Sequence, residues 1–262
     1  MNITIIVAAH KVYWMPDDAV YLPMFVGATG RETPDASWQR DDTGKNISEK
    51  NPTFCELTGH FWLWQNVQSD VYGLCHYRRY FGRCFGRKRS RILSGKQIGS
   101  MMKNCEILLP KKRHYWIETN HSQYVHAHHA EDLLLTRQIL AERYPSYLPA
   151  WEREMGRRCG HRFNMFVMRK EPFQAYSAWL FDILFELEKR LDISAYSPKD
   201  RRVFGYVAER LLDVWLSEQA LRVNECPIVY MEKQHWTRKA ISFLKRKFIH
   251  KGQTASPLDK KR

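Results

Sequence analysis

Hydrophobic residues run without interruption near the start of the chain. Residues 3–9, ITIIVAA, hold no charged side chain, which is typical of a strand buried on both faces of a parallel sheet. Apolar segments predict further strands over residues 71–77, 106–110 and 227–231, and alternating apolar and polar residues predict another over 162–170. These segments together predict a central sheet.

Apolar positions at helical spacing predict four helices, over residues 54–67, about 130–143, 172–191 and 202–221. The resulting order of strands and helices predicts an α/β domain. Ligands of such domains bind beyond the carboxyl ends of the strands, so side chains that follow strands are candidates for a site. Residues 27–53 are rich in Gly, Asp, Asn, Thr and Pro and predict a long functional loop.

The composition is that of a folded globular protein. The 262 residues, 44% of them hydrophobic, suffice for one large domain with a substantial core. No stretch of eighteen apolar residues is present, so no membrane-spanning helix is predicted, and the amino terminus lacks the basic region of a secretory signal. The six cysteines are scattered without metal-ligand spacing, which predicts reduced thiols in a cytoplasmic protein.

The net charge of +14 calls for an anionic partner, such as nucleic acid, an anionic membrane or a phosphorylated ligand. Residues 233–262 contain ten lysines and arginines against one acid, Asp259, and so carry nine of the fourteen net charges. Apolar residues recur every four positions among these cations, which predicts a basic amphipathic helix over 233–250 that associates with an anionic membrane. The alternative is an ordinary helix packed on the domain formed by residues 1–232. Residues 251–262 are predicted to be disordered.

The chain contains no G-x-x-x-x-G-K-[ST], G-x-G-x-x-G, H-E-x-x-H or G-x-S-x-G motif, which argues against P-loop NTPases, dinucleotide-binding dehydrogenases, zincins and α/β-hydrolases. Candidate chemistry appears where a strand ends, in GLCHYRRYF. There, Arg78 and Arg79 stand beside His76 and Tyr77. Two guanidinium groups can bind a diphosphate through paired hydrogen bonds. The alternative is a solvent-exposed arginine pair.

Two further groups of acids are candidates. In the long loop, Asp41, Asp42 and Asn46 could hold ribose hydroxyls or a divalent cation, and the alternative is a solvated turn.

Other carboxylates lie on the predicted helices. Glu131 and Asp132 begin one helix, where a carboxylate can act as a general base, and Glu209 and Arg210 lie on another. The alternatives are a capped helix start and a structural ion pair. The three histidines within residues 126–129 invite a zinc site, but no fourth ligand is evident.

Taken together, long stretches of the chain resemble a bacterial family of capsular and exopolysaccharide glycosyltransferases, long catalogued as a domain of unknown function. The resemblance spans about residues 3–248. It rests on the stretches RDDTGKNISEKNPTFCELTGHFWLWQN, VYGLCHYRRYF, LLPKKRHYWIETNHSQYVHAHHAEDL, FNMFVMRKEPFQAYSAWLFDILFELEKRLD, RVFGYVAERLLDVW and MEKQHW.

This resemblance implies a GT-A-like, Rossmann-like fold, with a mixed sheet flanked by helices. It implies a hexosyltransferase that moves a sugar from a UDP-linked donor to a lipid-linked oligosaccharide in capsule, exopolysaccharide or lipopolysaccharide O-antigen synthesis. Some relatives are associated with galactofuranose transfer. The acceptor implies a peripheral location at the inner face of the cell membrane.

The resemblance also implies roles for residues. The donor would bind at the residues that end and follow the first strand, Ala9, His10 and Lys11. GT-A enzymes usually hold a metal ion with Asp-x-Asp after a middle strand, but here that strand ends in His76-Tyr77-Arg78. We therefore expect Arg78 and Arg79, with Lys11 or Lys111, to replace the cation. No cofactor is then required, and Mn²⁺ or Mg²⁺ dependence is the alternative.

For an inverting reaction, the resemblance implies a carboxylate base, for which Asp132 is preferred over Glu131 and Glu209. A different class of function is a basic module that binds RNA or an acidic partner without catalysis. The concentration of charge in one terminal segment argues against that class, so no nucleic acid partner is expected. A phosphotransferase or nucleotidyltransferase is the alternative enzyme.

Overall fold

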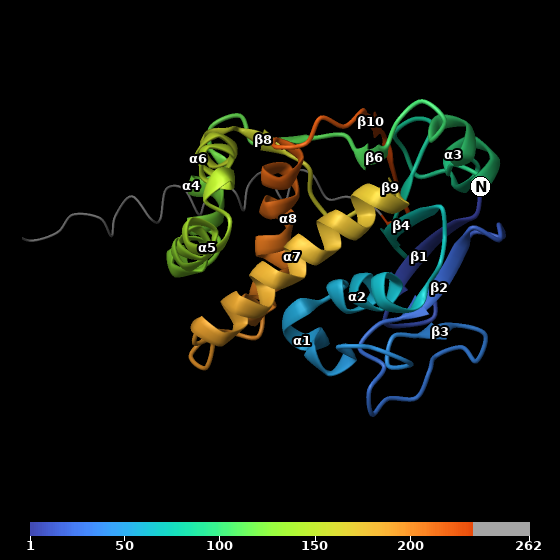
Figure 1. The fold of residues 1–262 in the computed structure, drawn as a ribbon. Coiled ribbons are helices and arrows are strands. Elements are labelled where there is room, and N and C mark those ends of the chain that lie inside the picture. Colours follow the sequence, from blue (N-terminus) through green and yellow to red (C-terminus); the bar gives the residue numbers. More distant parts are fainter. Residues whose placement is uncertain (233–262) are drawn as a thin grey trace, which may run out of the picture.

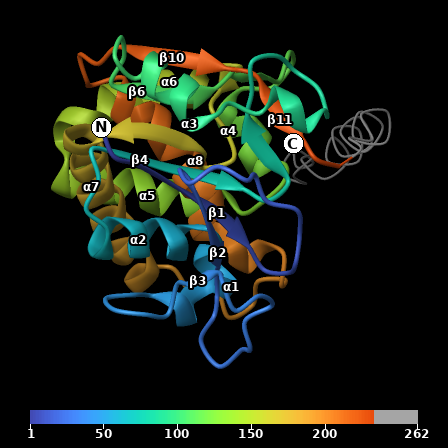
Figure 2. The same ribbon diagram turned by 90° about the vertical axis from the view of Figure 1, so that its right-hand side faces the viewer.

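A mixed β-sheet forms the centre of the protein, which the computed structural model describes over residues 1–232. Within these residues the sheet comprises β1 (Ile3–Ala9), β2 (Tyr21–Phe25), β3 (Gln39–Arg40), β4 (Val71–His76), β5 (Arg79–Phe81), β6 (Ile107–Pro110), β9 (Phe166–Arg169), β10 (Val223–Cys226) and β11 (Ile228–Tyr230). The strands lie in the order β10-β6-β9-β4-β1-β2-β3, and β5 pairs with both β4 and β11 (Figure 2).

The directions of the strands define one functional edge. β1 pairs in parallel with β2 and β4, whereas β9 runs antiparallel between β4 and β6. The carboxyl ends of β1 and β4 therefore meet the amino end of β9 at the same edge of the sheet. We call this edge, with the residues that follow β1 and β4 and precede β9, the rim. The predicted α/β class, with a mixed sheet flanked by helices, is confirmed.

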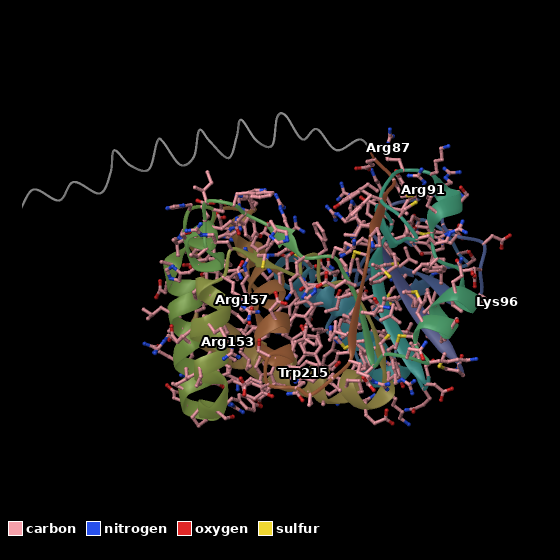
Figure 3. The ribbon with its side chains drawn as sticks, turned by 90° about the horizontal axis from the view of Figure 1, so that it is seen from above. Arg87, Arg91, Lys96, Arg153, Arg157 and Trp215 are labelled. Atoms are coloured by element: carbon pink, nitrogen blue, oxygen red, sulfur yellow. The ribbon has the colours of Figure 1, made fainter. Side chains whose placement is uncertain are left out.

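Helices cover both faces of the sheet. They are α1 (Asn51–Phe54), α2 (Leu57–Asn66), α3 (Gly95–Met101), α4 (Asn120–Val125), α5 (Ala130–Arg143), α6 (Leu148–Gly156), α7 (Lys170–Arg190) and α8 (Val203–Leu216), with short 3₁₀ turns at Ser48–Lys50, Arg89–Arg91, Pro145–Tyr147 and Asp200–Arg202. α2 and α7 lie on one face and α3 on the other (Figure 1). α8 packs on α7, and α4, α5 and α6 form a further layer, seen apart from the sheet in Figure 3. β7 (Arg113–His114) and β8 (Cys159–Gly160) make a separate ribbon.

The first strand shows why its apolar run is continuous. Ile6 and Ala8 belong to the core beneath α2 and α7, whereas Ile5 and Val7 belong to the core on the other face. All four are at most 3% exposed. Because successive side chains of a strand point to opposite faces, a strand covered on both faces needs an apolar residue at every position.

Three predicted elements have clearly different boundaries. The helix predicted over 202–221 ends at Leu216 as α8, and the other two are interrupted by residues with positive φ. The helix predicted over 54–67 is divided into α1 and α2, because Cys55 has a φ of 54° that a helix does not allow. The strand predicted over 162–170 begins only at β9, because Phe163 and Asn164 have φ values of 80° and 52°. The chain therefore changes direction where it approaches the ends of β1 and β4.

The membrane-associating helix predicted over 233–250 and the disorder predicted over 251–262 lie outside the described residues. Among the helices of residues 1–232, none has the length and apolar character needed to cross a bilayer. All six cysteines are free thiols.

A buried histidine gives the fold a pH dependence. His60 on α2 is 1% exposed, its Nε2 lies 2.8 Å from the Ser177 Oγ, and aromatic rings including Phe173 surround it. Burial lowers the pKa of His60 from 6.5 to about 3. Between these two pH values the unfolded chain binds a proton that the folded protein does not bind, so stability falls as the pH drops below 6.5.

We therefore expect the free energy of unfolding to decrease by up to about 1.4 kcal/mol per pH unit from this residue alone. Urea unfolding at pH 7 and pH 5 measures the decrease. The double variant His60→Phe/Ser177→Ala removes the titrating group together with its partner, and it should lose less stability over the same interval. Equal losses in the two proteins would show that His60 does not contribute.

Candidate active site at the rim

The arginine pair lies on a hairpin, not on a strand that runs out into solvent. β4 ends at His76 and β5 begins at Arg79, and these two residues pair in antiparallel fashion. Tyr77 and Arg78 therefore form the turn. The Tyr77 N–H donates to a carbonyl oxygen of β1 at 3.2 Å, and the Met231 N–H donates to the Arg78 carbonyl at 3.0 Å. The turn is thus fixed from both sides.

Arg79 is a largely buried cation that forms no ion pair within residues 1–232. Its Nε has no hydrogen-bond partner among them, and its guanidinium lies 4.4 Å from the centroid of the Phe163 ring. Burial lowers the pKa of Arg79, and the charge of Arg78 lowers it further, whereas the charges of Glu209 and Glu56 raise it. A buried charge without a partner is costly, and a bound anion would remove that cost.

More positive charge converges on the same place. The pKa of His10 is lowered by burial and by the charges of four neighbours, Arg78, Lys11, Arg31 and Arg202. The ring of Tyr77 lies 5.3 Å from the His10 ring, 5.9 Å from the Lys11 Nζ and 5.0 Å from the Arg78 guanidinium. The rim therefore brings together the predicted residues His10, Lys11, Tyr77 and Arg78.

Two of these cations, Arg31 and Arg202, were not predicted. They come from a loop after β2 and from the turn before α8. Arg202 begins the stretch RVFGYVAERLLDVW, but neither residue follows a predicted strand. Arg202 is held by a hydrogen bond from its Nε to the Cys55 Sγ at 3.0 Å, so the left-handed residue that separates α1 from α2 also positions a cation.

Two carboxylates face the cations. Asn164 Nδ2 donates to Glu56 Oε1 at 2.7 Å. The Phe163 N–H donates to Glu209 Oε1 at 3.0 Å, and Arg210 donates to Glu209 Oε2, also at 3.0 Å. The predicted ion pair between Glu209 and Arg210 is therefore present, and Glu209 also reaches the rim. Glu56 was not predicted as a site residue.

The segment between these carboxylates is strained. Positive φ values at residues other than glycine are uncommon, and each costs of the order of 1 kcal/mol or more. Phe163 and Asn164 both have such values, and the Phe163 carbonyl lies 2.6 Å from the His76 Nε2. Burial lowers the pKa of His76 against the effect of Glu56. The surroundings thus impose a conformation that presents Asn164 to Glu56.

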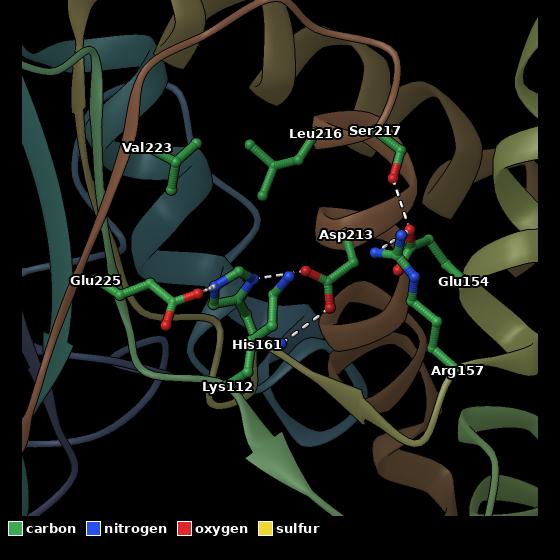
Figure 4. Close-up of a pocket in the computed structure, with 9 residues that line it drawn as sticks. All are labelled: Lys112, Glu154, Arg157, His161, Asp213, Leu216, Ser217, Val223 and Glu225. Carbon is green, nitrogen blue, oxygen red and sulfur yellow. Dashed lines mark hydrogen bonds and ion pairs between the residues drawn. The ribbon is translucent and has the colours of Figure 1, made fainter.

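A small cavity behind this segment helps to hold it. The cavity, of about 230 Å³, contains His161, whose Nδ1 lies 2.5 Å from Asp213 Oδ1 and whose Nε2 lies 3.2 Å from Glu225 Oε1 (Figure 4). Burial raises the pKa of Asp213, but the hydrogen bond from His161 and the charges of His161 and Arg162 lower it overall. These polar and charged groups pair with one another, and His161 lies two residues before Phe163. We therefore assign the cavity the role of supporting the segment Phe163–Asn164.

The predicted loop residues Asp41, Asp42 and Asn46 are engaged within the loop. Asp41 is fully buried, and its carboxylate accepts hydrogen bonds from four groups, the N–H groups of Gly27 and Ala28 and the hydroxyls of Ser48 and Thr58. Asp42 pairs with Arg40 at 2.6 Å, and Asn46 donates to the Asp42 carbonyl. Asp41 therefore presents no free oxygen to a ligand.

Replacing Asp41 should mainly reduce stability. We expect Asp41→Ala to lower the free energy of unfolding by about 3 kcal/mol, because it leaves several buried donors without an acceptor. Asp42→Ala is the matched control and should cost less than about 1 kcal/mol, since its ion pair with Arg40 is partly exposed. Urea unfolding measures both. A stable Asp41→Ala protein that fails to bind nucleotide would instead support the predicted donor contact.

The carboxylates predicted as bases lie in a different environment from the rim. Asp132 is 1% exposed, and its two oxygens accept hydrogen bonds from the hydroxyls of Tyr124 and Tyr196, each at 2.8 Å. Burial raises the pKa of Asp132, against these hydrogen bonds. Glu131 lines a separate hollow with Leu134 on the outer helices. The prediction that Asp132 is the base stays a prediction, but its burial and its two tyrosine partners lead us to prefer a carboxylate at the rim.

The three neighbouring histidines turn toward two carboxylates, His126 toward Glu118 and both His128 and His129 toward Asp200. His126 Nδ1 lies 2.5 Å from Glu118, His128 Nδ1 lies 3.2 Å from Asp200, and His129 Nε2 lies 4.0 Å from Asp200. Burial lowers the pKa of His128 to about 4. Within residues 1–232, no group of three His, Cys, Asp or Glu side chains is arranged to hold a metal ion.

Comparisons with known proteins agree with this fold. The apo structure of the WbbM bifunctional glycosyltransferase matches the chain with a TM-score of 0.82 and 30% sequence identity, over 89% of this chain and 46% of that one. The chain thus spans about half of the length of that protein. No curated protein matches the sequence. The family described as "Domain of unknown function (DUF4422)" matches residues 4–220. Since that match covers most of the chain, the protein belongs to the DUF4422 family.

Proposed function

We propose that the protein is a glycosyltransferase that moves a sugar from a nucleotide-diphosphate donor to a hydroxyl group of an acceptor. The observation that carries the proposal is Arg79, a largely buried guanidinium without an ion pair in residues 1–232, placed where sheets of this class bind their ligands. The likeness to a solved glycosyltransferase at 30% identity supports the same function.

In this proposal the cations of the rim bind the diphosphate. Negative charge grows on the leaving diphosphate as its bond to the sugar breaks, and fixed positive groups stabilise that charge. Arg79 is the central group, and Arg78 and Lys11 lie near the ring of Tyr77. The charge of Arg202 acts on the same region, because it lowers the pKa of His10. These groups take the place of a metal ion, so catalysis should continue when Mn²⁺ and Mg²⁺ are removed.

Glu56 is the general base in this proposal. One of its oxygens is held by Asn164 at 2.7 Å, and the other accepts no hydrogen bond from any group in residues 1–232. It can therefore accept a proton from an acceptor hydroxyl. Glu209 is the weaker candidate because both of its oxygens are already occupied, and we assign it the role of positioning the segment Phe163–Asn164.

The finer details follow from the resemblance noted above. We propose a UDP-linked donor, with galactofuranose the first sugar to test. We propose a lipid-linked oligosaccharide acceptor of capsule, exopolysaccharide or O-antigen synthesis, met at the inner face of the membrane. The basic sequence of residues 233–262 supports that location, and the function requires no nucleic acid.

The decisive experiment is incubation of the full chain with a panel of nucleotide sugars and a lipid-linked acceptor, followed by mass analysis of the product. An increase by one sugar residue supports the proposal. An increase by a phosphoryl or nucleotidyl group would identify a phosphotransferase or nucleotidyltransferase instead. Thermal stabilisation by single-stranded RNA, and by none of the nucleotide sugars, would favour a binding module.

A further inference from the structure

The loop between β5 and α3 projects from the fold on a rigid base. Gly82 and Ile92 form an antiparallel bridge. The Arg83 N–H donates to the Arg91 carbonyl at 2.9 Å, and the Leu93 N–H donates to the carbonyl of Phe81, at the end of β5, at 3.0 Å. The tip, residues 84–90, is therefore held by the chain segments on either side of it, and most of its residues are exposed.

This tip is strongly basic. Its cations are Arg83, Arg87, Lys88, Arg89 and Arg91, and residues 82–105 contain no acid. Within residues 1–232, the contacts of these side chains are to the carbonyl oxygens of Ser90 and Phe85 and to the ring of Trp14, not to carboxylates. The positive charge of the loop is therefore not neutralised by the described part of the protein.

An aromatic side chain lies at the centre of these cations. Phe85 is 55% exposed, and the Nζ of Lys111 lies 5.7 Å from the centroid of its ring. Lys111 follows β6, and the charge of Arg113, two residues further along, acts on Tyr230, whose N–H donates to the Gly86 carbonyl. A single exposed aromatic side chain is common on protein surfaces, but an aromatic ring set among basic side chains has the composition of a segment that lies at a membrane interface.

The tip also lies close to the candidate active site. The Tyr230 N–H donates to the Gly86 carbonyl at 2.9 Å, and the next residue, Met231, donates to the Arg78 carbonyl at 3.0 Å. β11 thus connects the loop to the turn of the rim. Figure 3 shows Arg87 and Arg91 together at one corner of the molecule, on the opposite half from Arg153 and Arg157.

We propose that residues 83–91, with Lys111 and Arg113, form a surface that docks the folded domain on an anionic lipid bilayer. Basic side chains are attracted to anionic headgroups, and an aromatic ring inserts at the level of the headgroups. A single-stranded nucleic acid is bound along a groove that follows its backbone, whereas this surface is a projecting tip. The evidence for docking comes from the described loop alone. It depends neither on residues 233–250 nor on the proposed function.

The test measures binding of the full chain to vesicles of equal parts phosphatidylglycerol and phosphatidylcholine, with pure phosphatidylcholine vesicles as reference. Arg87→Glu/Lys88→Glu should lower the partition coefficient at least about tenfold, since each basic residue near an anionic surface contributes about fivefold. Lys45→Glu/Lys189→Glu makes the same charge change at exposed positions away from the loop, and it should change binding less than about twofold.

A second pair of variants tests the aromatic contact. Phe85→Ala should weaken binding to the anionic vesicles, while Leu134→Ala, at a position exposed to almost the same extent (56%), should not. The proposal would be overturned if Arg87→Glu/Lys88→Glu weakened binding no more than Lys45→Glu/Lys189→Glu, and Phe85→Ala no more than Leu134→Ala. It would also be overturned if Arg87→Glu/Lys88→Glu weakened binding to single-stranded RNA and left vesicle binding unchanged.

A measurement on the unmodified sequence covers the case in which a variant does not fold. Cys84 at the tip is the exposed thiol among the cysteines, so it can be labelled with a polarity-sensitive fluorophore. Addition of the anionic vesicles should shift its emission to the blue. No shift, with the protein bound to the vesicles, would show that the tip does not touch the bilayer.

Discussion

Glu56→Gln is expected to lower kcat for sugar transfer by about a thousandfold, within the range found when a general base is removed. The amide keeps the size of the side chain and can still accept the hydrogen bond from Asn164, so the site should remain assembled. It cannot accept a proton from the acceptor hydroxyl. Affinity for the nucleotide sugar should change little, because Glu56 acts on the acceptor and not on the diphosphate.

Two comparisons make this result specific. Glu49→Gln changes an exposed acid on the nearby 3₁₀ turn and should retain full activity. Asp132→Asn tests the rival base, and we expect it to affect stability more than kcat, because Asp132 is enclosed by Tyr124 and Tyr196. An active Glu56→Gln protein beside an inactive, folded Asp132→Asn protein would reverse the assignment.

Arg79→Ala is expected to lower affinity for UDP by about a hundredfold and affinity for uridine hardly at all, because charge-assisted hydrogen bonds to a diphosphate are among the strongest in proteins. Titration calorimetry with the two ligands measures the difference. Arg78→Ala should have a smaller effect, since Arg78 is 42% exposed and pairs with Glu232 at 3.4 Å. Equal losses of UDP and uridine affinity would exclude a diphosphate role.

The same substitution has a second expected effect, of opposite sign. A buried cation without a partner destabilises the ligand-free protein, so Arg79→Ala should leave its unfolding temperature unchanged or raise it. The matched control is Arg83→Ala, an exposed arginine four residues away, which should alter neither stability nor UDP affinity. A marked loss of stability in Arg79→Ala would indicate that Arg79 supports the fold instead.

The sequence predicts the elements that have strong periodicity. The helix predicted over 130–143 has these same bounds in α5, and the first strand is β1, because long apolar patterns reflect burial directly. The short strands β2 and β10 were not predicted, since four or five residues with a mixed pattern carry little periodic signal. Their pairing is decided by neighbours distant in the chain.

The rim illustrates which part of a site can be predicted. His10, Lys11 and the pair Arg78–Arg79 follow strands, so the topology of the sheet brings them together. Glu56 was hidden inside a predicted helix, and only the left-handed Cys55 places it at a helix start.

The preference for a base other than Asp132 has a different cause. Acids at the start of a helix are common for electrostatic reasons, so the position of Asp132 could not distinguish a base from a buried structural carboxylate.

The smallest strand has a consequence for how the protein is made. β5 pairs with β4 through a single residue pair, His76 with Arg79, and with β11 through three. β11 ends at Tyr230, within the last part of the described chain. During synthesis on the ribosome, most of the sheet can therefore assemble before β5, with the turn Tyr77–Arg78 beside it, can pair with β11. If the rim binds the nucleotide donor as proposed, binding should appear only after Tyr230 has left the ribosome and β11 has paired with β5.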